Sequence, residues 1–196
     1  MTYDPAMHHR RSIRLRGYDY SRAGAYFVTL CTQQRKRLFG KIVNGELRLN
    51  DKGQMVVNRW EWLAEAYGHV LLDEYVVMPN HLHGIIMITD QCSGGMQGAP
   101  EQDVPTEKRK PLGRLIAAFK TASTNQINRS TAIVGKKLWQ RNFWEHIIRN
   151  ERELNLIRAY IRNNPAQWER DSLNAKQRVS PSPEIMRSSD LIWNRH

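Results

Sequence analysis

The pattern of apolar and polar positions is most informative near the middle of the chain. Residues 76–88 read Val-Val-Met-Pro-Asn-His-Leu-His-Gly-Ile-Ile-Met-Ile, which predicts a β-strand with His81 and His83 near its start. Because successive side chains of a strand point to opposite faces, both histidines lie on one face, followed by Ile85 and Met87. The other face is also apolar, so we expect a central strand that is covered on both sides.

The same kind of pattern predicts the elements that precede this strand. We expect strands over residues 26–32 and 70–78, which are rich in β-branched and aromatic side chains, and a small hairpin over residues 39–49. Apolar residues then recur at helical spacing after Asp51, which we expect to cap a helix together with Gln54 three residues later. The first half of the chain therefore mixes strands with a helix.

The second half continues in the same way. We expect a helix that begins near Pro111, a last strand over residues 138–149 and a final helix capped by Asn150. This order of elements predicts a ferredoxin-like (RRM-like) α+β fold, with a mainly antiparallel sheet and the helices on one face.

Composition along the chain suggests the boundaries of one domain. Residues 90–110 are dominated by Gly, Pro and polar side chains, which predicts a flexible insertion within the domain. We place the domain at residues 23–168, preceded by a basic arm over residues 1–22 and followed by a tail over residues 169–196.

The charge of the chain changes this picture by pointing to an acidic partner. The formal net charge is +11, which favours a nucleic acid, although a basic protein without a polyanionic partner remains possible on composition alone. Arg14 and Arg16 in the N-terminal arm are candidates for contact with a phosphate backbone, unless the arm is only a solvated tail. Further candidates for nucleic-acid contact are Lys120, Trp139 and Arg141.

Other classes of protein are disfavoured by what the sequence lacks. There is no apolar run of about 18 residues, and the N-terminus has no apolar core typical of a signal peptide, so we expect a cytoplasmic protein without a membrane partner. The two cysteines, Cys31 and Cys92, provide neither a disulfide framework nor a zinc site.

The histidine pair is the first candidate for chemistry. Two imidazoles side by side at the start of a buried strand suit a divalent cation, because neutral imidazole nitrogen binds such ions. Two ligands do not complete a site, and two structural histidines would give the same pattern. On the final helix, Tyr160 and Asn164 are four residues apart and share a face, with Pro165 marking the end of the helix. A lone tyrosine on a helix is usually structural.

A resemblance to a known family assigns the histidine pair, Tyr160 and Asn164 to one site. The segment Met78-Pro79-Asn80-His81-Leu82-His83 resembles the His-hydrophobic-His motif of the HUH endonuclease superfamily, and more narrowly the REP-associated tyrosine transposases. Residues 113–121 and 139–165 are also similar to the corresponding parts of that family. The resemblance extends over residues 17–168, with its motifs in the expected order.

The resemblance implies a mechanism and a set of ligands. It implies that Tyr160 is the nucleophile, that His81 and His83 bind a metal ion, and that Asn164 is the third ligand. An amide oxygen in that position suits Mg²⁺ or Mn²⁺. The expected substrate is single-stranded or hairpin DNA, which the family cleaves to a 5′-phosphotyrosine intermediate and a free 3′ hydroxyl.

Several alternatives stay open at this point. The chain is either a monomer or a homodimer, and Tyr160 serves either its own histidine pair or that of a partner subunit. A non-catalytic nucleic-acid-binding domain and a metal phosphodiesterase that uses water are the two rival functions.

Overall fold

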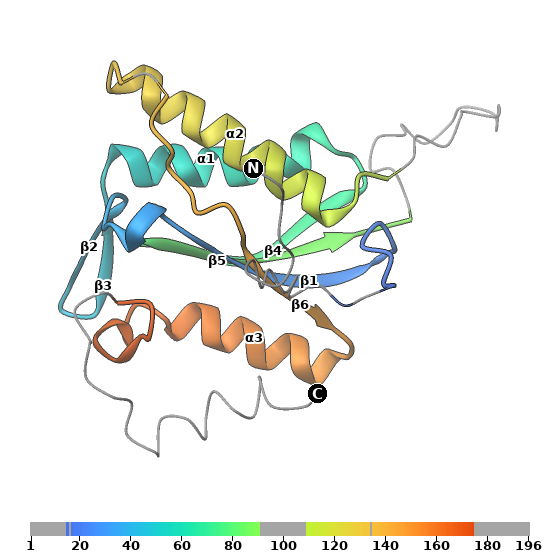
Figure 1. The fold of residues 1–196 in the computed structure, drawn as a ribbon. Coiled ribbons are helices and arrows are strands. Elements are labelled where there is room, and N and C mark those ends of the chain that lie inside the picture. The colour runs from blue at the N-terminus through green and yellow to red at the C-terminus, as the bar shows by residue number, and fades with distance from the viewer. Residues whose placement is uncertain (1–14, 16, 91–108, 134, 175–196) are drawn as a thin grey trace, which may run out of the picture.

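The computed structural model describes residue 15 and residues 17–90, 109–133 and 135–174 of the 196-residue chain (Figure 1). The predicted contacts of Arg14 and Arg16, most of the predicted insertion at 90–110 and the tail after residue 174 lie outside these described residues.

A four-stranded sheet forms the centre of the domain. In spatial order its strands are β4 (Val70–Met78), β5 (His81–Ile88), β1 (Gly24–Cys31) and β6 (Trp144–Ile148). All neighbouring pairs are antiparallel, and β5 lies between β4 and β1. The strand that carries the histidines is therefore central, as its apolar pattern predicted. A separate hairpin consists of β2 (Gly40–Val43) and β3 (Glu46–Leu49).

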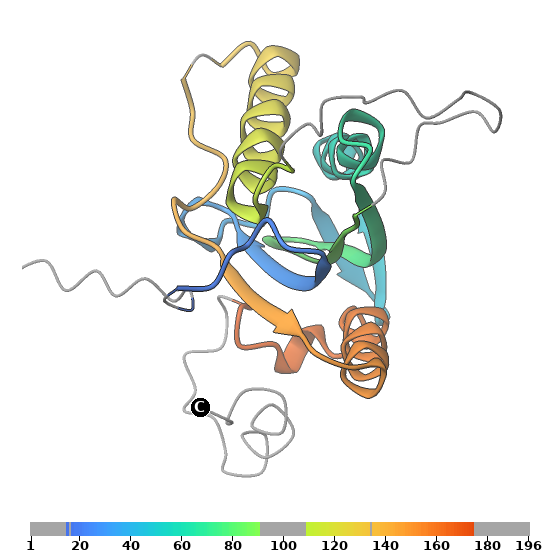
Figure 2. The same ribbon diagram turned by 90° about the vertical axis from the view of Figure 1, so that its right-hand side faces the viewer.

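The three α-helices of the described residues cover both faces of the sheet. Helices α1 (Asp51–Ala66) and α2 (Leu112–Ser130) lie on one face, and α3 (Glu151–Asn163) lies on the other (Figures 1 and 2). The α+β fold with an antiparallel sheet is confirmed. The expectation that all helices share one face holds only for α1 and α2, because the apolar stripe of α3 packs on the opposite side of β1 and β5.

The face under α1 and α2 holds the larger apolar core. Leu82 and Ile86 of β5 point into this core, together with Trp60 of α1 and Phe119 of α2. Gly84 makes room for Trp60, because a Cβ atom at this glycine would lie only 2.5 Å from the indole ring. None of the described helices is long and apolar enough to cross a membrane.

Two local predictions need correction. Helix α1 is capped by Asn50 instead of Asp51: the Asn50 side chain accepts a hydrogen bond from Gly53 N at 3.0 Å, and Asp51 is already in the first turn. The predicted strand over residues 138–149 is also too long, since β6 begins only at Trp144. Trp139 instead forms an isolated β-bridge with Thr32, the residue that directly follows β1.

Candidate metal and tyrosine site

The two histidines of β5 point toward α3, on the face opposite the larger core. Both are buried, at 0% exposed for His81 and 2% for His83, and their ring centroids are 4.5 Å apart. Burial lowers the pKa of His81 well below its ordinary value and the pKa of His83 to about 3. Both rings are therefore neutral near pH 7, the form in which imidazole binds a metal ion.

Oxygen atoms from the end of α3 and from the following turn complete the cluster. Asn164 follows α3, and Asp171 follows the short 3₁₀ helix η2 (Trp168–Arg170). Asp171 Oδ2 lies 3.5 Å from His81 Nε2, and one ligand atom each from His81, His83 and Asp171 lie within 4.8 Å of one another. These residues come from β5 and from the segment after α3, which the fold brings together.

The cluster has an unusual number of unsatisfied polar atoms. Among the described residues, His81 Nε2, Asn164 Oδ1 and Asp171 Oδ2 are buried without a hydrogen-bond partner. Burial of such atoms is costly, and native proteins nearly always satisfy them. The contact between His81 and Asp171 does not do so as an ion pair, because burial lowers the pKa of His81 and keeps its ring neutral. Nitrogen and oxygen lone pairs around one point fit a divalent cation.

Tyr160 of α3 borders the same cluster. Its hydroxyl lies 3.3 Å from His83 Nε2, and its ring packs edge-on against Phe27 at a centroid distance of 6.1 Å. Burial raises the pKa of Tyr160, the negative charge of Asp171 raises it further, and the Asn164 side chain lowers it. Without a nearby cation, the phenol is therefore firmly protonated near neutral pH.

The structure brings together the four residues that the motifs singled out, namely His81, His83, Tyr160 and Asn164. Their roles stay predictions. Asp171 was missed, because it follows Pro165 and a 3₁₀ turn, where no helical or strand periodicity relates its side chain to the histidines.

The candidates for nucleic-acid contact lie in different environments. Trp139 is only 6% exposed, and its indole N–H donates to Ser123 Oγ at 2.9 Å, so its ring belongs to the larger core. Lys120 Nζ donates to three successive backbone carbonyls, those of residues 140, 141 and 142. Arg141 is exposed within that segment. Contact of these residues with DNA stays a prediction.

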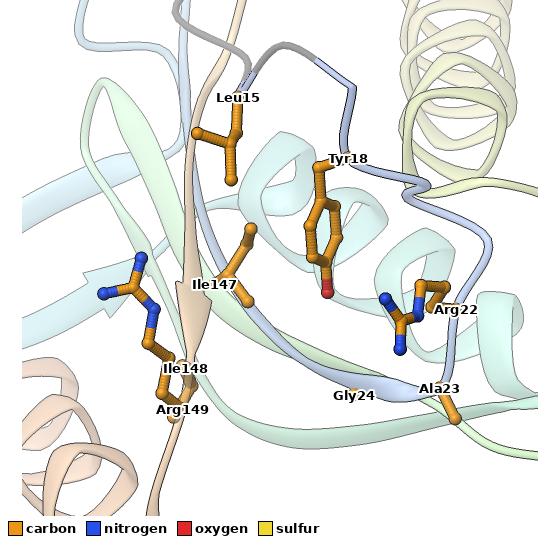
Figure 3. Close-up of a pocket in the computed structure, with 8 residues that line it drawn as sticks. All are labelled: Leu15, Tyr18, Arg22, Ala23, Gly24, Ile147, Ile148 and Arg149. Atoms are coloured by element: carbon orange, nitrogen blue, oxygen red, sulfur yellow. The ribbon is translucent and has the colours of Figure 1, made fainter.

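A separate cavity of about 330 Å³ lies beside Gly24 at the start of β1, whereas His81 pairs with Cys31 at the end of this strand (Figure 3). Leu15, Tyr18 and Ile147 point toward its interior, and Arg22 flanks it. It contains none of the histidine, tyrosine or carboxylate groups described above.

Comparison with known proteins gives relatives at two levels of similarity. No protein-family model matches the chain. A Haemophilus influenzae protein described only as an uncharacterized protein is 41% identical over 175 residues, covering 87% of this chain and 96% of the relative. A second Haemophilus influenzae protein, named "Putative REP-associated tyrosine transposase", is 26% identical over 157 residues, covering 76% of this chain and 74% of the relative.

A solved structure extends the comparison to the fold. It shows a REP-associated tyrosine transposase bound to a REP hairpin, and it matches with a TM-score of 0.52 and 19% identity over 87% of this chain and 89% of that chain. At 19% identity, this match is evidence for the fold alone. The resemblance that the sequence motifs indicated is thus confirmed. The chain belongs to the family of the 41% identical Haemophilus influenzae protein, and its fold is that of the REP-associated tyrosine transposases.

Proposed function

We propose that this protein is a metal-dependent endonuclease and strand transferase that acts on single-stranded DNA beside REP-like hairpins. The observation that carries the proposal is the position of Tyr160, whose hydroxyl faces His83 at 3.3 Å and borders the cluster of unpartnered ligand atoms. The named relative and the solved transposase with its REP hairpin support the choice of substrate.

The phenol oxygen of Tyr160 attacks the scissile phosphorus and loses its proton. The bond from phosphorus to the 3′ oxygen breaks, and that oxygen takes up a proton to become a free 3′ hydroxyl. The 5′ phosphate stays on Tyr160, so the energy of the phosphodiester is kept for transfer to another DNA end. The reverse attack by a 3′ hydroxyl on the phosphotyrosine restores a phosphodiester and frees the phenol.

Four side chains of the chain would hold the cation: His81, His83, Asn164 and Asp171. When bound there, Mg²⁺ or Mn²⁺ would withdraw negative charge from the scissile phosphate and favour ionisation of a nearby phenol. The Asn164 side chain acts in the same direction, since it lowers the pKa of Tyr160 that burial raises. The buried carboxylate of Asp171 adds a negative charge that favours a cation over a neutral ligand.

The basic charge of the chain supplies the attraction for DNA. Arg141 is exposed, and the backbone around it is held in place by Lys120, so we assign Arg141 to contact with a phosphate. Lys120 acts on DNA through this segment, because its own ammonium group is engaged by backbone carbonyls. Arg14 and Arg16 of the N-terminal arm remain further candidates for the DNA backbone.

The test uses a labelled hairpin with single-stranded flanks, incubated with the full chain and Mn²⁺ and then separated on a denaturing gel. We expect an SDS-resistant adduct whose proteolysis leaves a peptide with Tyr160 bonded to a DNA 5′ phosphate. The Tyr160→Phe variant should bind the hairpin and form no adduct. Tyr67→Phe is a matched control, because this tyrosine lies at the end of α1, on the opposite face of the sheet.

The outcomes separate the proposal from its two rivals. An adduct that persists in Tyr160→Phe would contradict the assignment of the nucleophile. Cleavage by the wild-type protein without any adduct would favour a phosphodiesterase that uses water. Binding without cleavage, in the presence of Mn²⁺, would favour a non-catalytic nucleic-acid-binding protein.

A further inference from the structure

The side-chain amide of Asn80, which precedes the first histidine, has a defined orientation. Its Nδ2 donates to the backbone carbonyl of Arg35 at 3.2 Å and to that of Leu173 at 2.8 Å. Carbonyl oxygens only accept hydrogen bonds, so the amide nitrogen must face them and Oδ1 must face the other way. Asn80 is 1% exposed, so water does not offer an alternative arrangement.

This orientation determines which nitrogen of His81 carries the proton. Asn80 Oδ1 lies 2.8 Å from His81 Nδ1, and an amide oxygen can only accept. His81 Nδ1 must therefore be the donor. In a neutral imidazole the other nitrogen then has a free lone pair, and His81 Nε2 is the buried atom without a hydrogen-bond partner beside Asp171.

A hydroxyl group plays the corresponding part for the second histidine. Thr29 lies directly opposite His83 in the pairing of β1 with β5, and its Oγ1 is 2.8 Å from His83 Nδ1. On the other side of the ring, the Tyr160 hydroxyl is 3.3 Å from Nε2. A phenol is a stronger donor than an aliphatic hydroxyl, because it is the more acidic group. The favoured arrangement has Nδ1–H donating to Thr29 and Nε2 accepting from Tyr160.

We infer that Asn80 and Thr29 are positioning residues, which hold His81 and His83 in the Nδ1–H tautomer and so leave both Nε2 lone pairs without a proton beside the candidate metal cluster. The use of these lone pairs as ligands rests on the proposed function. The tautomers themselves are properties of the protein without metal. Groups that orient metal-binding histidines in this way typically contribute about 10- to 100-fold to metal affinity.

Asn80 has a second effect that Thr29 lacks. The carbonyl of Leu173, which Asn80 holds, belongs to the turn in which Leu173 N donates to Asp171 Oδ1 at 2.7 Å. Asn80 thus orients His81 and also anchors the turn that carries Asp171. We therefore expect a larger loss of metal affinity from Asn80→Ala than from Thr29→Val.

The experiment measures tautomers and metal affinity separately. Nitrogen–proton correlation spectra of the imidazole rings in metal-free protein report which ring nitrogen is protonated, and calorimetric titration reports Mn²⁺ affinity. Thr29→Val keeps the shape of the side chain and removes the hydroxyl. Thr29→Ser is a separate variant that keeps the hydroxyl and removes the methyl group. Thr32→Val is the matched control, because the Thr32 hydroxyl is also in a buried residue but donates to the Lys36 carbonyl. Thermal unfolding confirms that each variant is folded.

We expect protonated Nδ1 in both histidines of the wild-type protein. Thr29→Val should lower Mn²⁺ affinity about 10- to 100-fold, with recovery in Thr29→Ser and no change in Thr32→Val. Protonated Nε2 in the wild type, or equal loss of affinity in Thr29→Val and Thr32→Val, would overturn the inference. If Nδ1 is protonated in both rings and Mn²⁺ does not bind, the tautomers stand as inferred and the proposed function fails.

Discussion

The two faces of the sheet differ in how they satisfy their buried groups. Under α1 and α2, the core is apolar and closely packed, with aromatic contacts such as that of Trp60 with Phe119 at a centroid distance of 5.2 Å, and the indole nitrogen of Trp60 is a buried polar atom there without a hydrogen-bond partner among the described residues. Under α3, a smaller apolar cluster borders three polar atoms that lack partners among the described residues. The larger apolar core under α1 and α2 therefore supplies most of the stability. This stability offsets the cost of the buried polar atoms under α3 that have no hydrogen-bond partner.

Strand β5 belongs to both faces, and its alternation explains how they coexist. Leu82 and Ile86 enter the larger core, and the odd-numbered residues His81, His83 and Ile85 point toward α3. A shift of register by one residue would exchange the two sets, so the apolar packing of one face fixes the position of the ligands on the other.

The largest expected effect on stability is on the face under α1 and α2. Trp60→Ala should lower the free energy of unfolding by about 3–5 kcal/mol, because it leaves a cavity over Gly84 and beside Phe119. Urea denaturation measures this change, and Leu71→Ala, at a position that is 43% exposed, is the control with little expected effect. A loss below about 1 kcal/mol would mean that this face does not carry the stability assigned to it.

A smaller effect is expected from acidification, and it belongs to the other face. The pKa of His83 falls from 6.5 in the unfolded chain to about 3 in the folded protein. Between pH 6.5 and pH 3, His83 is protonated in the unfolded chain and neutral in the folded protein. The free energy of unfolding therefore decreases as the pH falls from 6.5 toward 3. At pH 5 the loss from this group is about 2 kcal/mol relative to pH 8.

This prediction is tested as a difference between two proteins in the presence of chelator. The stability lost between pH 8 and pH 5 should be about 2 kcal/mol smaller in His83→Gln than in the wild type. The comparison is needed because the raised pKa of Asp171 acts in the opposite direction: its folded form gains a proton, and with it stability, on acidification. Identical pH dependence in both proteins would show that His83 titrates normally.

Sequence patterns predicted the parts of the site that regular elements position. Strand alternation placed His81 and His83 on one side, and helical spacing placed Tyr160 and Asn164 together, because both follow from fixed backbone periods. The likeness to a family connected the two pairs, which periodicity alone does not do.

The parts that were missed depend on irregular backbone. The chain leaves the strand pattern between Trp139 and Trp144, so the first of these tryptophans enters the larger core and the second lies opposite Thr29 on the face under α3. Asp171 reaches the histidines through a turn that is held by hydrogen bonds from distant residues, among them that of Asn80 to the Leu173 carbonyl and that of Arg35 to the Ser172 carbonyl. Contacts of this kind join residues far apart in sequence and have no period from which they could be predicted.

The smallest expected change in stability is at Asp171, and its sign distinguishes the two faces. Asp171→Asn removes a buried carboxylate whose Oδ2 has no hydrogen-bond partner among the described residues, and it places an amide donor near the lone pair of His81 Nε2. We expect the free energy of unfolding at pH 8, without metal, to rise by about 1 kcal/mol. Mn²⁺ affinity, measured by calorimetric titration, should fall by about tenfold or more.

Asp73→Asn is the matched control for this substitution on the same side of the molecule. Asp73 of β4 accepts two hydrogen bonds from Arg158 of α3, and these bonds lower the pKa of the carboxyl group. Loss of the Asp73 carboxylate in Asp73→Asn should therefore destabilise the protein and leave Mn²⁺ affinity unchanged. If Asp171→Asn instead destabilises the metal-free protein as Asp73→Asn does, Asp171 is a structural partner of its surroundings, and the face under α3 keeps fewer unsatisfied groups for a cation than we infer.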